Sequence, residues 1–173
     1  MNSEIAKSLY RLRQRVRQYH LRQRVGEKQP LGNHTMNTSG ETSLTQLVQA
    51  MQPSLADECF IFCTLAESIA IPLIPQTLGF FREVEGVTLI LEKEVALAHQ
   101  IQFHGEWAKI TLRVHSSLEA VGFLATISQP LATAGISTNV ISAFYHDHLF
   151  VQWDRREKAI EILNHLAQTA AHL

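Results

Sequence analysis

The stretch His146-Asp147-His148 holds the side chains with the clearest capacity for metal or acid–base chemistry. On an extended chain the two imidazoles point to one side, where they could share a metal ion. Zinc takes three or four ligands, so His115 or His99 would have to converge on the pair from a distance. We therefore predict no metal site and interpret the stretch as a polar turn that shields a hairpin, with a pH-sensitive contact as the alternative.

Catalytic motifs are a second source of chemistry, and the sequence contains no GxSxG, P-loop or GxGxxG pattern. Four carboxylates flank a predicted strand, at Glu83, Glu85, Glu92 and Glu94. Catalysis by a carboxylate pair needs two such groups to converge in a cleft with shifted pKa values. We interpret these carboxylates as a solvated edge, and we predict that the protein is not an enzyme and has no cofactor.

The composition divides the chain into two unlike parts. Of its 173 residues, 46% are apolar and 18% charged, which suits a packed core and permits one ordinary domain or two small ones. Residues 1–35 carry eight Lys or Arg against two Asp or Glu, whereas residues 36–173 carry seven against fourteen. A nucleic-acid partner is therefore not expected for residues 36–173.

Residues 1–35 form a basic extension in which several apolar residues recur at near-helical spacing. Three interpretations stay open: an upstream over-extension with Met36 as the true start, a flexible arm of no specific role, or an arm that binds nucleic acid or an anionic surface. We assign no function to this extension.

The two cysteines, Cys59 and Cys63, lie in the run Cys-Phe-Ile-Phe-Cys. If the run is a strand, their Cα atoms are about 13 Å apart, which is too far for a disulfide. Two unbridged thiols fit a reducing cytoplasm, and the N-terminus lacks the apolar core of a secretory signal. No apolar run reaches the length of a membrane helix, so we expect a cytoplasmic protein without a membrane span.

A first lobe is predicted over residues 36–104. The run Ser43-Leu44-Thr45-Gln46 matches the capping-box pattern, so we expect a helix there that ends before Pro53. The lobe continues with a strand over 60–65, an irregular or one-turn connection over 66–79, strands over 80–83 and 87–91, and a helix over 92–99.

A second lobe is predicted over residues 105–173. Apolar and polar residues alternate over 108–115, which indicates a half-buried strand. A capping box over 116–119 predicts a helix that ends by Gly135, with Pro130 causing a kink near Thr126 or a restart. Strands over 137–144 and 148–153 follow, and a capping box over 154–157 opens a final helix.

The two lobes repeat one element order: strand, connection, strand, turn, strand, helix. Phe81 and Phe144 both precede a turn and a strand, and Ala96 and Ala159 both lie in the following helix, with a spacing of 63 residues in each pair. The repeat is weak in residue identity, but it indicates two related lobes. The second lobe alone is a split βαβ arrangement whose fourth strand must come from the first lobe.

Three runs of the second lobe resemble an ACT domain: ITLRV (110–114), AVGFLA (120–125) and AGISTNVIS (134–142). The resemblance covers about residues 106–170, and residues 43–100 by position only. It is greatest to short bacterial proteins with two ACT-like lobes, and more distant to the regulatory regions of aspartate kinases. It implies an α+β fold, ferredoxin-like βαββαβ, in two interlocked ACT-like lobes with antiparallel sheets.

The resemblance also implies an amino acid bound between two ACT units. Independently, the connection after the strand leads into a helix N-terminus, whose backbone amides attract a carboxylate. We expect the binding site to be lined by two segments, one that follows the strand over 108–115 and one on the strand over 137–144. They comprise His115, Ser116, Ser117, Leu118, Glu119, Ala120, Val121, Gly122 and Phe123, followed by Ser137, Thr138, Asn139, Val140, Ile141 and Ser142.

Each of these residues also has a purely structural interpretation, such as capping for Ser116 and Glu119, packing for Gly122 and a local hydrogen bond for Asn139. From their joint occurrence we predict a non-catalytic regulatory protein that senses an amino acid or similar small metabolite at a lobe–lobe interface. A homodimer or a partner protein would transmit the signal. The alternative is a ligand-free structural or protein-interaction module that dimerises through its sheets.

Overall fold

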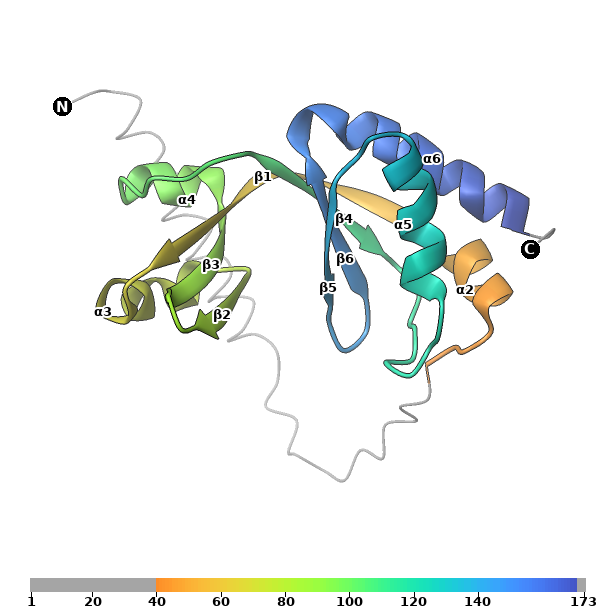
Figure 1. Ribbon diagram of the computed structural model, residues 1–173, viewed down its shortest axis with the longest axis horizontal. Coiled ribbons are helices and arrows are strands. Elements are labelled where there is room, and N and C mark those ends of the chain that lie inside the picture. The colour runs from red at the N-terminus through yellow and green to blue at the C-terminus, as the bar shows by residue number, and fades with distance from the viewer. Residues whose placement is uncertain (1–39, 171–173) are drawn as a thin grey trace, which may run out of the picture. The chain divides into compact units, whose positions relative to one another are not determined.

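Figure 1 shows the computed structural model of the chain, which describes residues 40–170. These residues form two compact units: a small unit, Phe62–Phe103, and a large unit made of residues 40–61 and 104–170. The described part of the chain begins in the large unit, leaves it for the small one and then returns. The lobe boundary between residues 104 and 105 stays a prediction, and the basic extension over 1–35 lies outside the described residues.

The large unit is built on four antiparallel strands in the order β1-β4-β6-β5. The first part of β1 (Pro53–Leu65) pairs with β4 (Trp107–Leu112), so an early segment supplies the strand that the second lobe lacks, as predicted. The hairpin of β5 (Thr138–Ser142) and β6 (Asp147–Gln152) completes the sheet.

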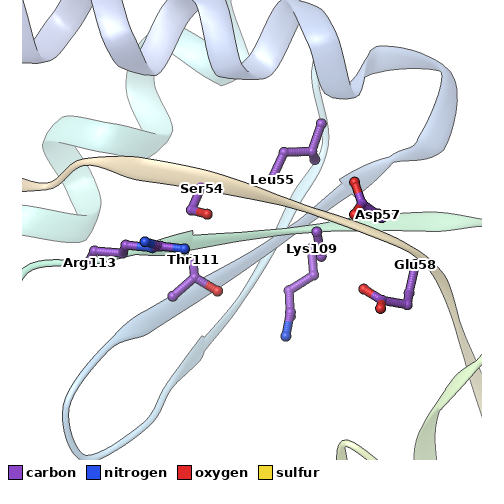
Figure 2. A pocket seen from close by; sticks show the side chains of 8 residues that line it. Ser54, Leu55, Asp57, Glu58, Lys109, Thr111 and Arg113 are labelled. Atoms are coloured by element: carbon purple, nitrogen blue, oxygen red, sulfur yellow. The ribbon is translucent and has the colours of Figure 1, made fainter. Parts of the chain in front are cut away.

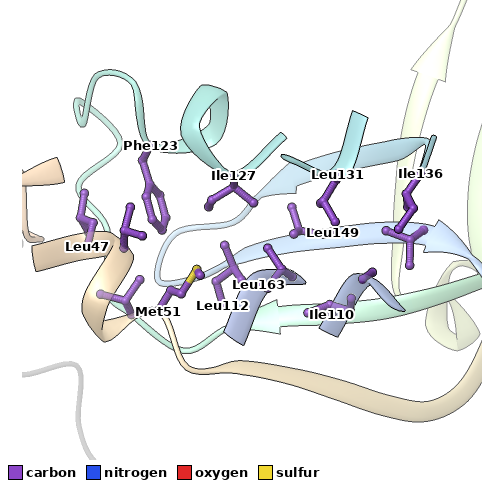
Figure 3. Packing of buried hydrophobic residues seen from close by; sticks show 14 of the residues in the cluster. Leu47, Met51, Ile110, Leu112, Phe123, Ile127, Leu131, Ile136, Leu149 and Leu163 are labelled. Carbon is purple, nitrogen blue, oxygen red and sulfur yellow. The ribbon is translucent and has the colours of Figure 1, made fainter. Parts of the chain in front are cut away.

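Three helices pack on one face of this sheet: α2 (Leu44–Ala50), α5 (Phe123–Thr133) and α6 (Arg156–Thr169). Period-two alternation in β4 directs Ala108, Ile110 and Leu112 toward them, as the sequence predicted. Figure 3 shows the resulting core, in which Leu47, Met51, Ile110, Leu112, Ile127, Leu131, Leu149 and Leu163 are fully buried. Burial of such apolar side chains is the main force that holds the unit together.

The small unit pairs β2 (Gly79–Glu83) with β3 (Gly86–Glu92), and β3 lies beside the second part of β1 in the strand order. Three short helices complete it: α3 (Glu67–Ala70), the 3-10 helix η1 (Ile71–Gln76) and α4 (Lys93–Ala98). The predicted strands are confirmed here, and the connection over 66–79, which we expected to be irregular or a single turn, contains α3 and η1 rather than one long helix. Strand β3 is largely buried, whereas β2 is largely exposed.

None of the three predicted capping boxes makes a side-chain cap hydrogen bond, although Ser43 is the N-cap residue of α2, as predicted. Ser43 precedes α2 without a side-chain cap, and the Glu41 carboxylate instead accepts hydrogen bonds from the backbone amides of Thr42 and Ser43. The helix expected from Ser116 begins only at Phe123. The run 154–157 is divided between the 3-10 helix η2 (Trp153–Arg155) and the start of α6.

Two further boundaries bear on the expectation. Helix α5 ends before Gly135, as predicted, and the φ of +70° at this glycine is the left-handed conformation of a helix C-terminus, but the helix does not restart at Pro130. Strand β1 begins at Pro53 rather than at residue 60. No helix in the described part of the chain is long and apolar enough to cross a membrane.

Candidate functional site

Residues 113–122 connect β4 to α5 and form a loop where the sequence pattern predicted the start of a helix. The loop is held on its first side by backbone hydrogen bonds. The amide of Arg113 donates to the carbonyl of Met51 at 2.6 Å, and Glu41 bridges the carbonyl of His115 and the amide of Ser117 at 3.0 and 3.1 Å. The segment that precedes α2 therefore fixes the first half of the loop.

Gly40 makes this close approach possible. A Cβ atom at this position would lie 2.5 Å from the Ser117 nitrogen and 2.6 Å from the Ser116 carbonyl carbon. Real side chains do not tolerate such contacts with backbone atoms, so any larger residue would push the two segments apart. The position of the loop thus depends on a glycine far from it in sequence.

Asp147 holds the loop on its other side. Its carboxylate is 5% exposed, and its two oxygens accept hydrogen bonds from the hydroxyls of Ser116 and Ser142. The bond from Ser116 is 2.9 Å long. One buried carboxylate therefore joins the loop to the ends of β5 and β6, which lie at the same end of the unit as the start of α5 (Figure 1).

The start of α5 has the character of an anion site. Gly122 is the N-cap in a left-handed conformation, with φ +89°, and no side chain caps the helix. The first amides of a helix lack intrahelical acceptors and carry the positive end of its dipole. A ligand carboxylate next to the backbone amide of Phe123 would supply the missing acceptor.

The loop directs its apolar side chains outward. Leu118 is 69% exposed and Val121 is 88% exposed, whereas Phe123 packs into the core. The His115 ring lies beside exposed aromatic rings of the β5–β6 connection, with centroids 5.1 Å from Tyr145 and 6.5 Å from Phe144. The end of the unit therefore carries an apolar and aromatic border next to the uncapped helix.

The second predicted segment, 137–142, is only partly near this loop. Ser142 reaches it through Asp147, but Asn139 lies opposite Phe150, three residues back along β5. At about 3.3 Å per residue, Asn139 is about 10 Å from Ser142 along the strand. Val140 packs against the core and Ser137 donates its amide to the Gln152 side chain, so contact of residues 137–141 with a ligand stays a prediction.

Sequence reasoning missed Asp147 and Glu41 as the residues that hold the loop. The sequence pattern groups Asp147 with the two histidines beside it, which hides the separate role of its carboxylate. Its register with Leu149 and Val151, at alternating positions of one strand, is the signal that could have shown it facing inward. Glu41 contacts the loop through its backbone atoms, and every residue type can make such contacts, so the sequence gives no signal for them.

The histidines do not form a metal site among residues 40–170, where no group of three His, Cys, Asp or Glu side chains could hold an ion. His146 Nδ1 lies 3.3 Å from the Val114 carbonyl, and His148 Nδ1 lies 3.0 Å from the Thr111 hydroxyl. Burial lowers the pKa of His148, assisted by Lys109 and His146 and opposed by Asp147. Burial therefore favours the neutral form of the His148 ring.

Comparison with known proteins identifies the architecture. Two family models, each described as an ACT domain, match residues 39–107 and 103–165. A Vibrio cholerae protein of unknown function, described as a possible transport protein, shares 40% sequence identity at a TM-score of 0.65, over 73% of this chain and 97% of that one. No protein of curated function matches the chain.

Two more distant structures share the fold alone. A protein from Agrobacterium tumefaciens has 20% identity and a TM-score of 0.56, covering 66% of this chain and 87% of its own. The ligand-free regulatory subunit of aspartate kinase from Thermus thermophilus has 11% identity and a TM-score of 0.53, covering 68% and 97%. The fold is the predicted α+β, ferredoxin-like architecture, and two ACT-domain models match the chain in tandem. The chain therefore belongs to the ACT-domain family of regulatory, ligand-binding domains.

Proposed function

We propose that this chain is a non-catalytic regulatory protein that senses an amino acid or a similar small metabolite at the loop 113–122. The observation that carries the proposal is the uncapped start of α5, behind a loop that Glu41 and Asp147 hold in place. The ligand carboxylate would accept hydrogen bonds from the first amides of α5. Its side chain would lie against the apolar border formed by Leu118 and Val121.

Regulation requires that the ligand bind two states of the protein with different affinity. The loop is suited to this, because it is joined to the segment before α2 and to the β5–β6 connection at once. A ligand that moved the loop would move both. We place the second half of the site on another ACT unit, as the resemblance implies, and we place the protein in the cytoplasm because Cys59 and Cys63 are both thiols.

The test is a panel of the common amino acids added to the full chain while thermal unfolding is followed. A ligand at about 100 times its dissociation constant stabilises the folded state by about 2.7 kcal/mol. We expect at least one amino acid to raise the unfolding midpoint. The variant Val121→Asp adds a carboxylate at the start of α5, where it repels the ligand carboxylate but is itself favourable to the helix dipole.

The matched control is Val84→Asp, which introduces the same charge at a fully exposed valine of the small unit. We expect Val121→Asp to abolish the ligand-induced shift without lowering the midpoint of the unliganded protein, and Val84→Asp to retain the shift. Two results would overturn the proposal: no amino acid stabilises the wild-type chain, or Val121→Asp responds as the wild type does.

A ligand-free module that dimerises through its sheets is the second candidate, and the exposure of β2 favours it. This strand ends the order β2-β3-β1 and leaves Phe80 42% and Phe81 50% exposed. An exposed edge strand with aromatic side chains is a template for pairing with a second copy. Sedimentation equilibrium would then show a dimer that Phe81→Lys dissociates, in a protein whose stability no amino acid changes.

A further inference from the structure

A shallow hollow of about 300 Å³ lies on the face of the large unit's sheet that the helices leave open. Its lining comes from β1 and from β4 and its continuation, as Figure 2 shows. The polar members are Ser54, Asp57, Glu58, Lys109, Thr111 and Arg113. None of them belongs to the loop 113–122 except Arg113 at its first position, so the hollow is separate from the amino-acid site proposed above.

An irregularity in the sheet creates the hollow. Leu55 pairs with Ile110, but the next pair along the ladder is Cys59 with Ala108. Residues 56–58 of β1 therefore lie opposite Lys109 alone, which makes a bulge with two extra residues. A bulge bends its strand and redirects side chains. Here it brings Asp57 and Glu58 to one end of the hollow.

The charges in the hollow are separated by sign. Arg113 lies beside Thr111 at one end, Glu58 and Asp57 lie at the other, and Lys109 extends between them (Figure 2). Among the described residues, no ion pair within 4.0 Å involves any of these four side chains. Two cations and two carboxylates thus face one hollow without neutralising each other.

Neighbouring groups prepare the positive end for an anion. Ser54 is directly opposite Thr111 in the β1–β4 register, so two hydroxyls lie beside Arg113. The Thr111 hydroxyl contacts Nδ1 of His148 at 3.0 Å, and when that nitrogen carries its proton the hydroxyl is free to donate. Lys109 Nζ lies 5.4 Å from the centroid of the Phe60 ring, an aromatic contact that positions its ammonium.

We propose that this hollow binds a small zwitterion whose two charges are separated by several carbon atoms, with its anionic group on Arg113 and Thr111 and its ammonium on Asp57 and Glu58. A ligand with no net charge matches a lining with no net charge. Asp57 and Glu58 lie opposite Lys109, which is four residues before Arg113, so the two ends of the hollow are about 13 Å apart along the backbone. The adjacent charges of an α-amino acid are too close to reach both ends.

The probe is 6-aminohexanoate, titrated calorimetrically into the full-length protein. Hexanoate and hexylammonium each carry one of its charges, and glycine carries both without the spacer. Arg113→Gln and Glu58→Gln each remove one end of the hollow, and Arg155→Gln is the matched control because Arg155 is exposed on η2 outside the hollow. Circular dichroism and thermal unfolding establish that the variants fold.

We expect saturable binding of 6-aminohexanoate that is at least about tenfold tighter than that of hexanoate, hexylammonium or glycine. Arg113→Gln and Glu58→Gln should each weaken it by about tenfold, and Arg155→Gln should leave it unchanged. Equal binding of the four probes, equal binding by the variants, or no heat at about 10 mM 6-aminohexanoate would overturn the inference. The amino-acid response lost in Val121→Asp is a separate readout, so either proposal can fail alone.

Discussion

Ser116 and Asp147, 31 residues apart in sequence, are joined by a hydrogen bond of 2.9 Å from the serine hydroxyl to Oδ2 of the carboxylate. Asp147 is buried and its other oxygen accepts the hydroxyl of Ser142. The loop that leads into α5 and the β5–β6 hairpin therefore share one acceptor. If the loop is the ligand site, Asp147 is the residue through which it communicates with the sheet.

Replacing Asp147 tests this connection. Asp147→Ala leaves two hydroxyls without their acceptor, and hydrogen bonds to a charged group contribute about 1.5–3 kcal/mol each. We expect the free energy of unfolding to fall by about 2–4 kcal/mol in urea denaturation. Asp154→Ala, at an exposed aspartate, should change it by no more than about 0.5 kcal/mol. Equal effects of the two substitutions would show that the Asp147 hydrogen bonds do not stabilise the loop.

Gly40 tests the other side of the loop. Gly40→Ala brings a Cβ within 2.5 Å of the Ser117 nitrogen, so Glu41 and the loop must separate and lose their backbone hydrogen bonds. We expect a loss of about 1–3 kcal/mol and faster hydrogen exchange of the Ser117 amide. The control is Gly79→Ala, whose Cβ would meet only the Ile90 side chain at 3.9 Å. An unchanged exchange rate at Ser117 would contradict the predicted displacement.

The regular parts of the fold could be predicted because their signals are local. The alternation over 108–115 identified β4 and the face that carries Ile110 and Leu112, since burial on one side of a strand has a period of two. The first part of β1 was missed for the converse reason. The bulge at residues 56–58 adds two residues, so the alternation breaks where the strand continues.

Helix α2 begins at Leu44, directly after Ser43, as predicted, but the helix expected from Ser116 begins only at Phe123, because a capping pattern describes local interactions alone. The Ser116 hydroxyl is instead oriented toward Asp147, to which it donates a hydrogen bond and which lies far away in the sequence. Pro130 was expected to kink or restart its helix, but α5 runs through it. Ile127 and Leu131, on either side of Pro130, are fully buried, and their burial offsets a proline cost of about 3 kcal/mol.

His148 should make stability depend on pH. Its pKa is lowered chiefly by burial, with Lys109 and His146 acting in the same direction and Asp147 opposing them. The unfolded chain therefore binds this proton at a higher pH than the folded chain, and folding stability falls as the pH decreases below about 6.5. Thermal unfolding at several pH values should show a smaller acid loss for His148→Gln than for the wild type. An equal loss of stability at acid pH in both proteins would show that His148 does not cause it.

Lys109→Met should raise the pKa of His148 in an NMR titration, because it removes a nearby positive charge. The value should remain below the ordinary one of about 6.5, since burial is the larger cause. An unchanged titration midpoint of His148 in Lys109→Met would show that the lysine charge does not affect the pKa of the ring.

The two cysteines should react at different rates. Cys63 is buried, and burial raises the pKa of its thiol, opposed by a hydrogen bond with the backbone of Leu89. Because the thiolate is the reactive form, Cys63 should be alkylated more slowly than the half-buried Cys59. A timed iodoacetamide pulse followed by peptide mass spectrometry measures both sites, with Cys59→Ser isolating the slow one. Faster labelling of Cys63 in the folded protein would contradict the prediction.

The most direct test of the proposed sensor is a backbone amide NMR titration with the amino acid that stabilises the chain most in the thermal panel. We expect saturable shifts of the Phe123, Leu124 and Ala125 amides, because these donors start α5 and would bind the ligand carboxylate. Val121→Asp should abolish those shifts, and Val84→Asp should preserve them. Amide shifts that leave residues 123–125 unmoved while the amino acid saturates the protein would contradict the central claim.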